Sequence, residues 1–386
     1  MTTLRRLGAL LVVLVVATVA FAKDQAPLPA PAAEKARADK PLIQVAILLD
    51  TSSSMSGLIN QARTQLWTIV NEFARSKQGG QTPRLEVALY EYGNSNLSAG
   101  EGYIRQILPL TEDLDKISEQ LFVLTTNGGD EYCGHVIQSA TKGLAWSDSA
   151  KVYKAIFIAG NEPFTQGPVD SSISCKAAIA RGIIVNTIHC GSEAQGIAGN
   201  WNRGALLADG KFLVIDQNQA IVHIEAPQDK EIVKLNEELN KTYITYGSMA
   251  PASKARQVAQ DSNAAAKAEA GAFVQRTVSK ASANYSNDGW DLVDACKNKD
   301  FDITKVKEAD LPEEMRKQTI EERQAYVAGK TAERDAIQKK VLALNKDREA
   351  YVSTKRQESA KTDTLDTAMA KALRAQAEKK GIKWDK

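Results

Sequence analysis

The side chains best suited to chemistry in this sequence are three oxygen donors at alternate positions, Asp50, Ser52 and Ser54. They follow a mostly apolar run directly, in the segment IQVAILLDTSSSM. A strand that ends on Asp50 before a helix can aim all three groups at one point, at the edge where open α/β sheets bind their ligands. Because Mg²⁺ and Mn²⁺ prefer carboxylate, hydroxyl and water oxygens, the segment indicates a divalent-metal site. The alternative is that these residues only cap the helix and bind loop amides.

The elements that must position these groups lie between residues 41 and 225, where strand-like and helix-length segments alternate. The strand-like runs are 43–50, 85–93, 103–110, 154–160, 183–191 and 211–216, and the helical segments are 57–75, 113–124, 134–146, 171–181 and 197–209. Continuous apolar strands separated by helices are typical of a mostly parallel sheet covered on both faces. No helix fits the loop from 93 to 102, so its two flanking strands are expected to form a hairpin. The predicted fold class is a doubly wound α/β domain with a six-stranded sheet and one antiparallel edge strand, followed by an all-α C-terminal region.

This order of elements around Asp50 resembles a von Willebrand factor A (VWA) domain. Asp50, Ser52 and Ser54 match the metal-ion-dependent adhesion motif of that family, and the segment IVNTIHCGSEAQGIAGNWNRGALLADGKFLVID is similar to its closing strand, helix and strand. The resemblance covers about half of the chain, from 41 to 225. It implies a metal site at the carboxyl edge of the sheet and a protein partner whose carboxylate completes the coordination of the ion.

Two further ligands normally complete the motif in this family, and both differ here. The family's Thr in a Gly-rich loop corresponds to Asp130 in TTNGGDEYCG, and its Asp in a Thr-Asp-Gly turn corresponds to Asn161 in AGNEPF. One exchange adds a negative charge and the other removes one, and every position still donates oxygen. The expected metal ligands are therefore Asp50, Ser52, Ser54, Asp130 and Asn161, with Mg²⁺ or Mn²⁺ as the ion.

Composition and motifs argue against several other functions. The chain has 386 residues with 49 Lys and Arg against 47 Asp and Glu, so no charge excess favours nucleic acid. The sequence contains no HExxH, GxSxG or GxxxxGK motif, and an enzyme is not expected. Cys133 with His135, and His189 with Cys190, lack the paired spacing of a structural zinc site.

The N-terminal region predicts export. Arg5 and Arg6 precede an apolar run from 7 to 21, and alanines stand at 20 and 22, as in a signal peptide over residues 1–22. A membrane anchor is the alternative, but a span needs about 20 apolar residues. Residues 23–40 are rich in Pro, Ala and charge and are expected to form a flexible linker. We expect a periplasmic or secreted protein with no membrane span after cleavage.

Four cysteines in an exported chain suggest disulfides, and the sequence leaves their pairing open. Cys133, Cys175 and Cys190 are expected near one rim of the sheet, where a bridge among them is reasonable. Cys296 would then be left over or linked to the second region. The alternative is four small buried thiols.

The strands stop after residue 225. Residues 226–300 are expected to form a helical extension that docks on the sheet domain, with an apolar knot around Trp290 as the docking point. Residues 301–360 are expected to form a charged helical hairpin or a short coiled coil, and 361–386 a flexible tail. An apolar stripe there contains Ile337 and Val341, but Arg334 and Arg348 lie on the same stripe, which favours a solvated hairpin.

The function expected from these features is an exported protein-binding module that captures a partner through its divalent-metal site. The first alternative is a metal-independent structural or assembly scaffold that acts through the C-terminal helices. The second alternative is a hydrolase of unknown type.

Overall fold

The computed structural model describes residues 40–216, 223–268, 271–358 and 365–384. The predicted signal peptide and all but the last residue of the predicted linker lie outside these ranges. No helix within them is long and apolar enough to cross a membrane.

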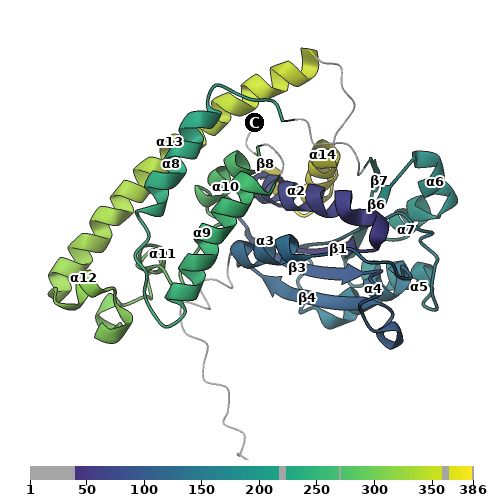
Figure 1. Cartoon of the computed structure of the whole chain (residues 1–386), viewed down its shortest axis with the longest axis horizontal. Helices are drawn as coiled ribbons and strands as arrows, with labels where there is room; N and C mark the ends of the chain where they lie inside the picture. Colours follow the sequence, from purple (N-terminus) through teal and green to yellow (C-terminus); the bar gives the residue numbers. More distant parts are fainter. Residues whose placement is uncertain (1–39, 217–222, 269–270, 359–364, 385–386) are drawn as a thin grey trace, which may run out of the picture.

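A six-stranded sheet forms the centre of the first half of the chain (Figure 1). Its strand order is β4-β3-β1-β5-β6-β7, and β4 is the one strand that runs antiparallel to its neighbour. The strands are β1 (Leu42–Asp50), β3 (Arg84–Tyr92), β4 (Ile104–Thr111), β5 (Tyr153–Gly160), β6 (Ile183–Cys190) and β7 (Phe212–Ile215). This topology, with helices between the parallel strands, confirms the predicted fold class.

Helices cover both faces of the sheet because its strands are apolar on both sides. Alternate β1 residues such as Val45 and Leu49 pack towards α2 (Ser56–Ala74) and α3 (Leu114–Val123). Ala46 and Leu48 pack on the opposite face, which is covered by α4 (Cys133–Gly143), α5 (Ser171–Ala180) and α7 (Trp201–Leu207). The helix expected over 197–209 is two helices, α6 (Glu193–Ala198) and α7, because Asn200 adopts a φ of 65° between them.

The C-terminal helices form a second layer beside α2 and α3 (Figure 1). They are α8 (Asp229–Asn240), α9 (Ala250–Ala266), α10 (Ala272–Lys280), α11 (Leu292–Ala295), α12 (Glu313–Arg316) and α13 (Ile320–Glu358). The guanidinium of Arg276 on α10 is buried and bonds Asp115 of α3 at 2.6 Å and Asp261 of α9 at 2.7 Å. This cluster ties the helical layer to the sheet domain, whereas Trp290, the expected docking point, stacks on Tyr243 within the helical layer.

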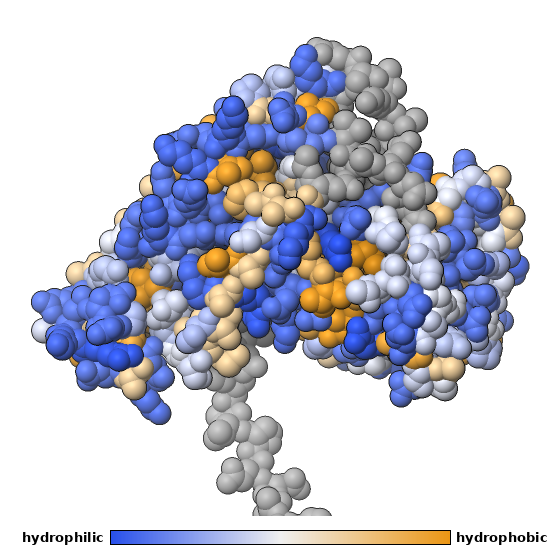
Figure 2. All heavy atoms as spheres, in the orientation of Figure 1, coloured by the Kyte–Doolittle hydropathy of each residue, from blue (hydrophilic) through white to orange (hydrophobic). Residues whose placement is uncertain are grey.

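Most of the region 301–360, expected as a hairpin or coiled coil, is a single 39-residue helix, α13, docked on α8 (Figure 1). Ile337 and Val341 pack into an apolar cluster with residues of α8 and α10. Arg334 is buried and bonds Asp291 and Asp294, and Arg348 bonds Asp229 at 2.7 Å. The two arginines therefore do not keep the stripe in solvent, because carboxylates of the facing elements neutralise them. The outer surface of this arm is largely hydrophilic (Figure 2).

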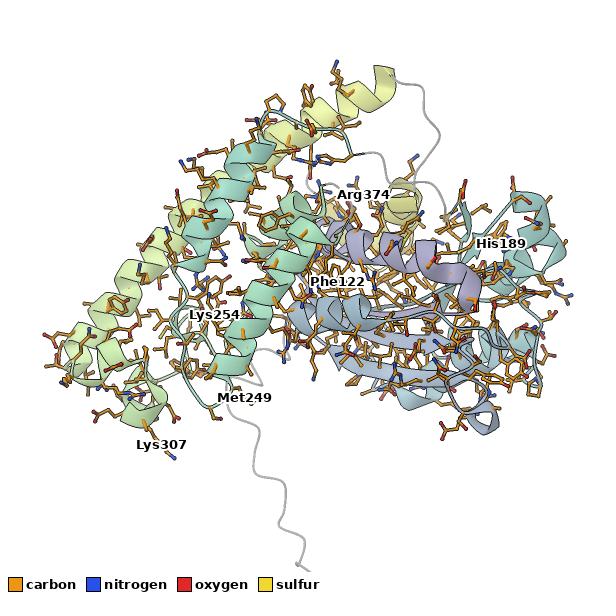
Figure 3. The ribbon with its side chains drawn as sticks, viewed as in Figure 1. Phe122, His189, Met249, Lys254, Lys307 and Arg374 are labelled. Carbon is orange, nitrogen blue, oxygen red and sulfur yellow. The ribbon has the colours of Figure 1, made fainter. Side chains whose placement is uncertain are left out.

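The prediction of a flexible tail over 361–386 is wrong for residues 365–384. These residues form α14 (Leu365–Glu378) and β8 (Ile382–Trp384), and β8 pairs with the short strand β2 (Ser76–Gln78). Met369, Leu373 and Ile382 belong to the core between α2 and the sheet. Arg374 lies beside α2 in Figure 3 and binds Glu72 of that helix. The tail is ordered because it completes the cover of this face.

Candidate metal centre

Asp50 is the last residue of β1, and its carboxyl group is fully buried at the carboxyl edge of the sheet. Its Oδ1 accepts a 2.7 Å hydrogen bond from the backbone N–H of Ser52. The hydroxyls of Ser52 and Ser54 lie 3.4 Å apart. Neither the short helix η1 (Ser53–Met55) nor α2 receives a side-chain cap at its N-terminus. The serine hydroxyls thus do not act as helix caps, which weakens the capping interpretation.

The carboxylate that faces Asp50 belongs to Glu131. The Glu131 side chain is buried, and a Cβ added at Gly93 would lie 2.8 Å from its Cγ and 2.9 Å from Asp50 Oδ1. Asp130, expected from the sequence to be the fourth ligand, is exposed, and its Oδ2 accepts a 3.2 Å hydrogen bond from Tyr132. The structure therefore brings Glu131 to Asp50 and turns Asp130 outward.

Contacts of the loop from 125 to 132 determine which of the two acids faces inward. The Asn127 N–H donates to Thr51 O at 3.0 Å, and the Glu131 N–H donates to the Gln166 side chain at 2.8 Å. Gly129 passes so close to the next loop that an added Cβ would lie 2.5 Å from Gly93 O. Because adjacent side chains of an extended segment point in opposite directions, this docking places Glu131 inside and its neighbour outside. The loop sequence has no periodic pattern, so it could not indicate that Glu131 rather than Asp130 faces inward.

Asn161 lies directly after β5, the strand that pairs with β1 on the other side. A Cβ added at the preceding residue, Gly160, would lie 3.1 Å from Asp50 Oδ2 and 2.5 Å from Tyr92 Oη. Only glycine lets β5 pass so close to the carboxylate. Asn161 is half-buried, and its Oδ1 is buried with no hydrogen-bond partner in the described chain.

Ionisation of both buried carboxyl groups, Asp50 and Glu131, is unfavourable when no cation is present. Burial raises the pKa of Asp50 above its ordinary value. Burial and the neighbouring Asp50 carboxyl raise the pKa of Glu131 to about 9. Two buried carboxylates cannot both ionise at low cost unless a cation lies between them, and without a cation one of them keeps its proton.

At this centre, three buried acceptor oxygens have no donor among the residues that the structure describes: Asp50 Oδ2, Glu131 Oε2 and Asn161 Oδ1. Buried acceptors normally receive hydrogen bonds, so such a group suits a cation. Within the same residues, no group of three or more His, Cys, Asp or Glu side chains is arranged so that it could hold a metal ion by itself. An ion here would therefore depend on serine and asparagine oxygens in addition to the two carboxylates.

Aromatic side chains pack around the buried side of the centre. Tyr92 Oη donates to Ala159 O at 3.0 Å, and the Trp201 indole N–H donates to Glu162 O at 2.8 Å. His189 packs against Trp201, with ring centroids 5.7 Å apart, at the end of the sheet near α6 (Figure 3). These contacts hold the β5 turn that carries Asn161.

The cysteines near this rim are free thiols. Cys133, Cys175 and Cys190 are buried, and Cys296 is exposed. The Cys133 thiol lies 3.7 Å from Tyr92 Oη, and burial raises its pKa well above the ordinary value. This environment suits small buried thiols rather than metal-binding thiolates.

Comparisons with known proteins found solved structures that are similar to slightly less than half of the chain. No protein-family model matches the chain, and no curated protein matches it. Among solved structures, BatB from Bacteroides thetaiotaomicron is 17% identical, with 45% of this chain and 90% of that chain covered and a TM-score of 0.35. A von Willebrand factor type A structure from Catenulispora acidiphila is 16% identical, with coverages of 46% and 39% and a TM-score of 0.34. Proximal thread matrix protein 1 from the mussel byssus, in a form with a zinc-occupied MIDAS motif, is 13% identical, with coverages of 45% and 42% and a TM-score of 0.33.

Proposed function

We propose that the sheet domain binds a divalent cation, Mg²⁺ or Mn²⁺, and uses it to capture a carboxylate of a protein partner. The ligands we assign are Asp50, Ser52, Ser54, Glu131 and Asn161. A bound cation would neutralise the buried carboxylates and offer a coordination position to an incoming anionic oxygen. The protein side chains would position that oxygen at the exposed rim of the sheet. Export to the periplasm or the cell exterior is part of this proposal.

The observation that carries the proposal is the group of three buried, donor-free oxygens on Asp50, Glu131 and Asn161. When both acids are ionised, hydrogen bonds within the described chain do not satisfy these oxygens, and the helix starts do not use the serine hydroxyls as caps. A metal-free scaffold would keep buried acceptors and a buried carboxylate pair at a cost in stability. A bound cation offsets that cost, and all the donors are the hard oxygens that Mg²⁺ and Mn²⁺ accept.

The direct test is titration calorimetry with Mn²⁺ and Mg²⁺ on the full chain and on two isosteric variants, Glu131→Gln and Asp130→Asn. Each variant removes one carboxylate, from adjacent positions of the same loop. We expect Glu131→Gln to weaken binding at least tenfold and Asp130→Asn to leave it within about twofold, because exposed charges are screened by solvent. No binding heat from the wild type, or an equal loss in both variants, would refute the assignment.

Partner capture separates this function from that of a metal-independent scaffold. Truncation of the C-terminal helices is unsuitable, because α14 covers the core of the sheet domain. Point variants on the full chain avoid this problem. If capture of a partner from a periplasmic extract is lost with EDTA and in Glu131→Gln, the metal site carries it. If capture ignores both, the C-terminal helices act as a scaffold and the proposal fails.

A further inference from the structure

His189, near the end of β6, is a buried imidazole without a hydrogen-bond partner. The residue is 3% exposed, and neither Nδ1 nor Nε2 has a partner among the residues that the structure describes. A neutral imidazole carries one N–H donor and one acceptor nitrogen, so both polar atoms of this ring are unpaired. Unpaired polar atoms at this depth cost free energy. The polar groups of the ring therefore do not hold it in its closed position.

The short helix α6 and the turn before it lie against His189, at the outer end of the sheet domain beside α7 (Figure 1). Gly196 is the buried residue of α6, and a Cβ added there would lie 3.0 Å from His189 Cβ and 2.6 Å from Phe212 Cζ. A Cβ added at Gly191, where the chain leaves β6, would lie 2.8 Å from His189 Nε2. The other residues of α6 are exposed, Ile197 by 49%. Because few apolar contacts hold α6, it should open at lower cost than the sheet.

Residues 192–198 form a segment that is fixed at both ends, and we call it the α6 flap. At its start, the Gly191 N–H donates to Ile215 O at 3.0 Å. At its end, Gly199 O accepts from the Phe164 N–H at 2.8 Å. In the described chain, the hydrogen bonds of the flap stay within it and the turn that follows it. The flap can therefore lift from His189 without loss of a hydrogen bond to the sheet.

A positive charge on the closed imidazole would be unfavourable. Within the described ranges, no hydrogen bond or ion pair joins His189 to an acid or to an assigned metal ligand. The charged residues of the surrounding elements are all exposed: Glu162, Asp170, Glu193, Arg203 and Lys211. Burial lowers the pKa of His189 below its ordinary 6.5. Once the flap opens, water solvates the ring and its pKa returns towards 6.5.

We propose that the α6 flap is an acid-sensitive switch that closes over neutral His189 and opens when the imidazole takes up a proton. Because the pKa of His189 is lower in the closed state, closure is fully favoured above pH 6.5 and weakens as the pH falls below it. If the closed ring stays neutral, the open population should rise about tenfold between pH 7.5 and 5.5. The flap follows β6 at the carboxyl edge of the sheet, so acid would alter the surface beside the candidate metal centre.

The first test is amide hydrogen exchange with mass spectrometry at pH 7.5 and 5.5, on the full chain in EDTA, for peptides that contain the α6 flap. The matched variants are His189→Gln and His135→Gln, each of which replaces one of the three histidines by a neutral side chain. His135 lies on α4, outside the flap. Comparison at the same pH cancels most of the intrinsic pH dependence of exchange. We expect the ratio of the wild-type rate to the His189→Gln rate to rise at least fivefold from pH 7.5 to 5.5. The ratio to His135→Gln should change less than twofold.

NMR titration of the histidine ring C–H signals provides a second readout that needs no change at position 189. The signals lost in His135→Gln and His223→Gln leave the third signal assigned to His189, and its pKa should lie below 6.5. A pKa at or above 6.5, a constant exchange ratio, or an equal effect of His135→Gln would overturn the proposal. Circular dichroism checks that each variant keeps its fold. Because both measurements are made in EDTA, their failure is distinguishable from failure of the proposed metal site.

Discussion

Replacement of Glu131 by Gln should stabilise the metal-free protein at alkaline pH while it weakens metal binding. In the folded protein, burial and Asp50 raise the pKa of Glu131 from its ordinary 4.5 to about 9. A group whose folded pKa is raised contributes stability below its unfolded pKa and loses that contribution as the pH rises towards its folded pKa. The wild type should therefore lose stability from this pair between about pH 4.5 and 9. A glutamine keeps the shape and stays neutral, so the variant should not show this loss.

The size of the effect follows from the same displacement of the pKa. Each pH unit of difference between the folded and unfolded pKa corresponds to about 1.4 kcal/mol. If half of the difference between 4.5 and about 9 is realised, the variant should gain about 3 kcal/mol over the wild type at pH 9. At pH 4.5 the two proteins should be nearly equal in stability. Titrating groups that do not contact Glu131 are shared by the two proteins, so their contributions cancel in the comparison.

Urea unfolding in EDTA, at five pH values from 4.5 to 9, measures this difference directly. Asp130→Asn is the matched control, because it removes an exposed carboxylate one residue away. Its free energy of unfolding should follow the wild type within about 0.5 kcal/mol at every pH. Parallel curves for the wild type and Glu131→Gln would refute the reasoning, since they would mean that no buried proton is held between the two acids. A stabilised Asp130→Asn would point to the wrong carboxylate.

Two further changes test the packing around the site and the tail. Gly93→Ala should reduce both stability and Mn²⁺ affinity, because φ is +79° and the new Cβ would contact the two buried carboxylates. A Cβ added at Gly100 makes only an ordinary contact, 3.7 Å from Ser98 Oγ, so Gly100→Ala should be neutral in differential scanning fluorimetry with and without Mn²⁺. An unchanged Mn²⁺ affinity in Gly93→Ala would contradict the geometry. Leu373→Ala should cost about 2–5 kcal/mol in urea unfolding, because Leu373 on α14 is fully buried, while the half-exposed Val258→Ala should cost less than about 0.5 kcal/mol. Equal costs would mean that α14 does not cover the core in solution.

The repeating pattern of the sequence was sufficient for the fold. Continuous apolar runs of strand length alternate with amphipathic segments of helical period 3.6, and both patterns can be recognised without knowledge of any contact. The loop from 93 to 102 excluded a helix, so the antiparallel edge strand was also predictable. The strand end at Asp50 placed an acid and two hydroxyls at the correct edge of the sheet.

Tertiary packing decided the features that have no period. Glu131 faces the site and Asp130 does not, because backbone contacts set the register of a loop that carries no local pattern. In the sequence, Arg334 and Arg348 indicate that their helical stripe faces solvent. In the structure both are buried, because acids distant in sequence neutralise them.

The contrast between β1 and the C-terminal tail separates the properties that local sequence determines from those that tertiary packing determines. The sequence alone determined the doubly wound sheet and the position of Asp50 at its carboxyl edge, because backbone geometry makes those properties local. Only the tertiary structure showed that residues 365–384 complete the core and that Glu131 is the second acid of the candidate centre. Both depend on which distant surface a short segment meets, and that is determined by packing over the whole chain rather than by the residues of the segment itself.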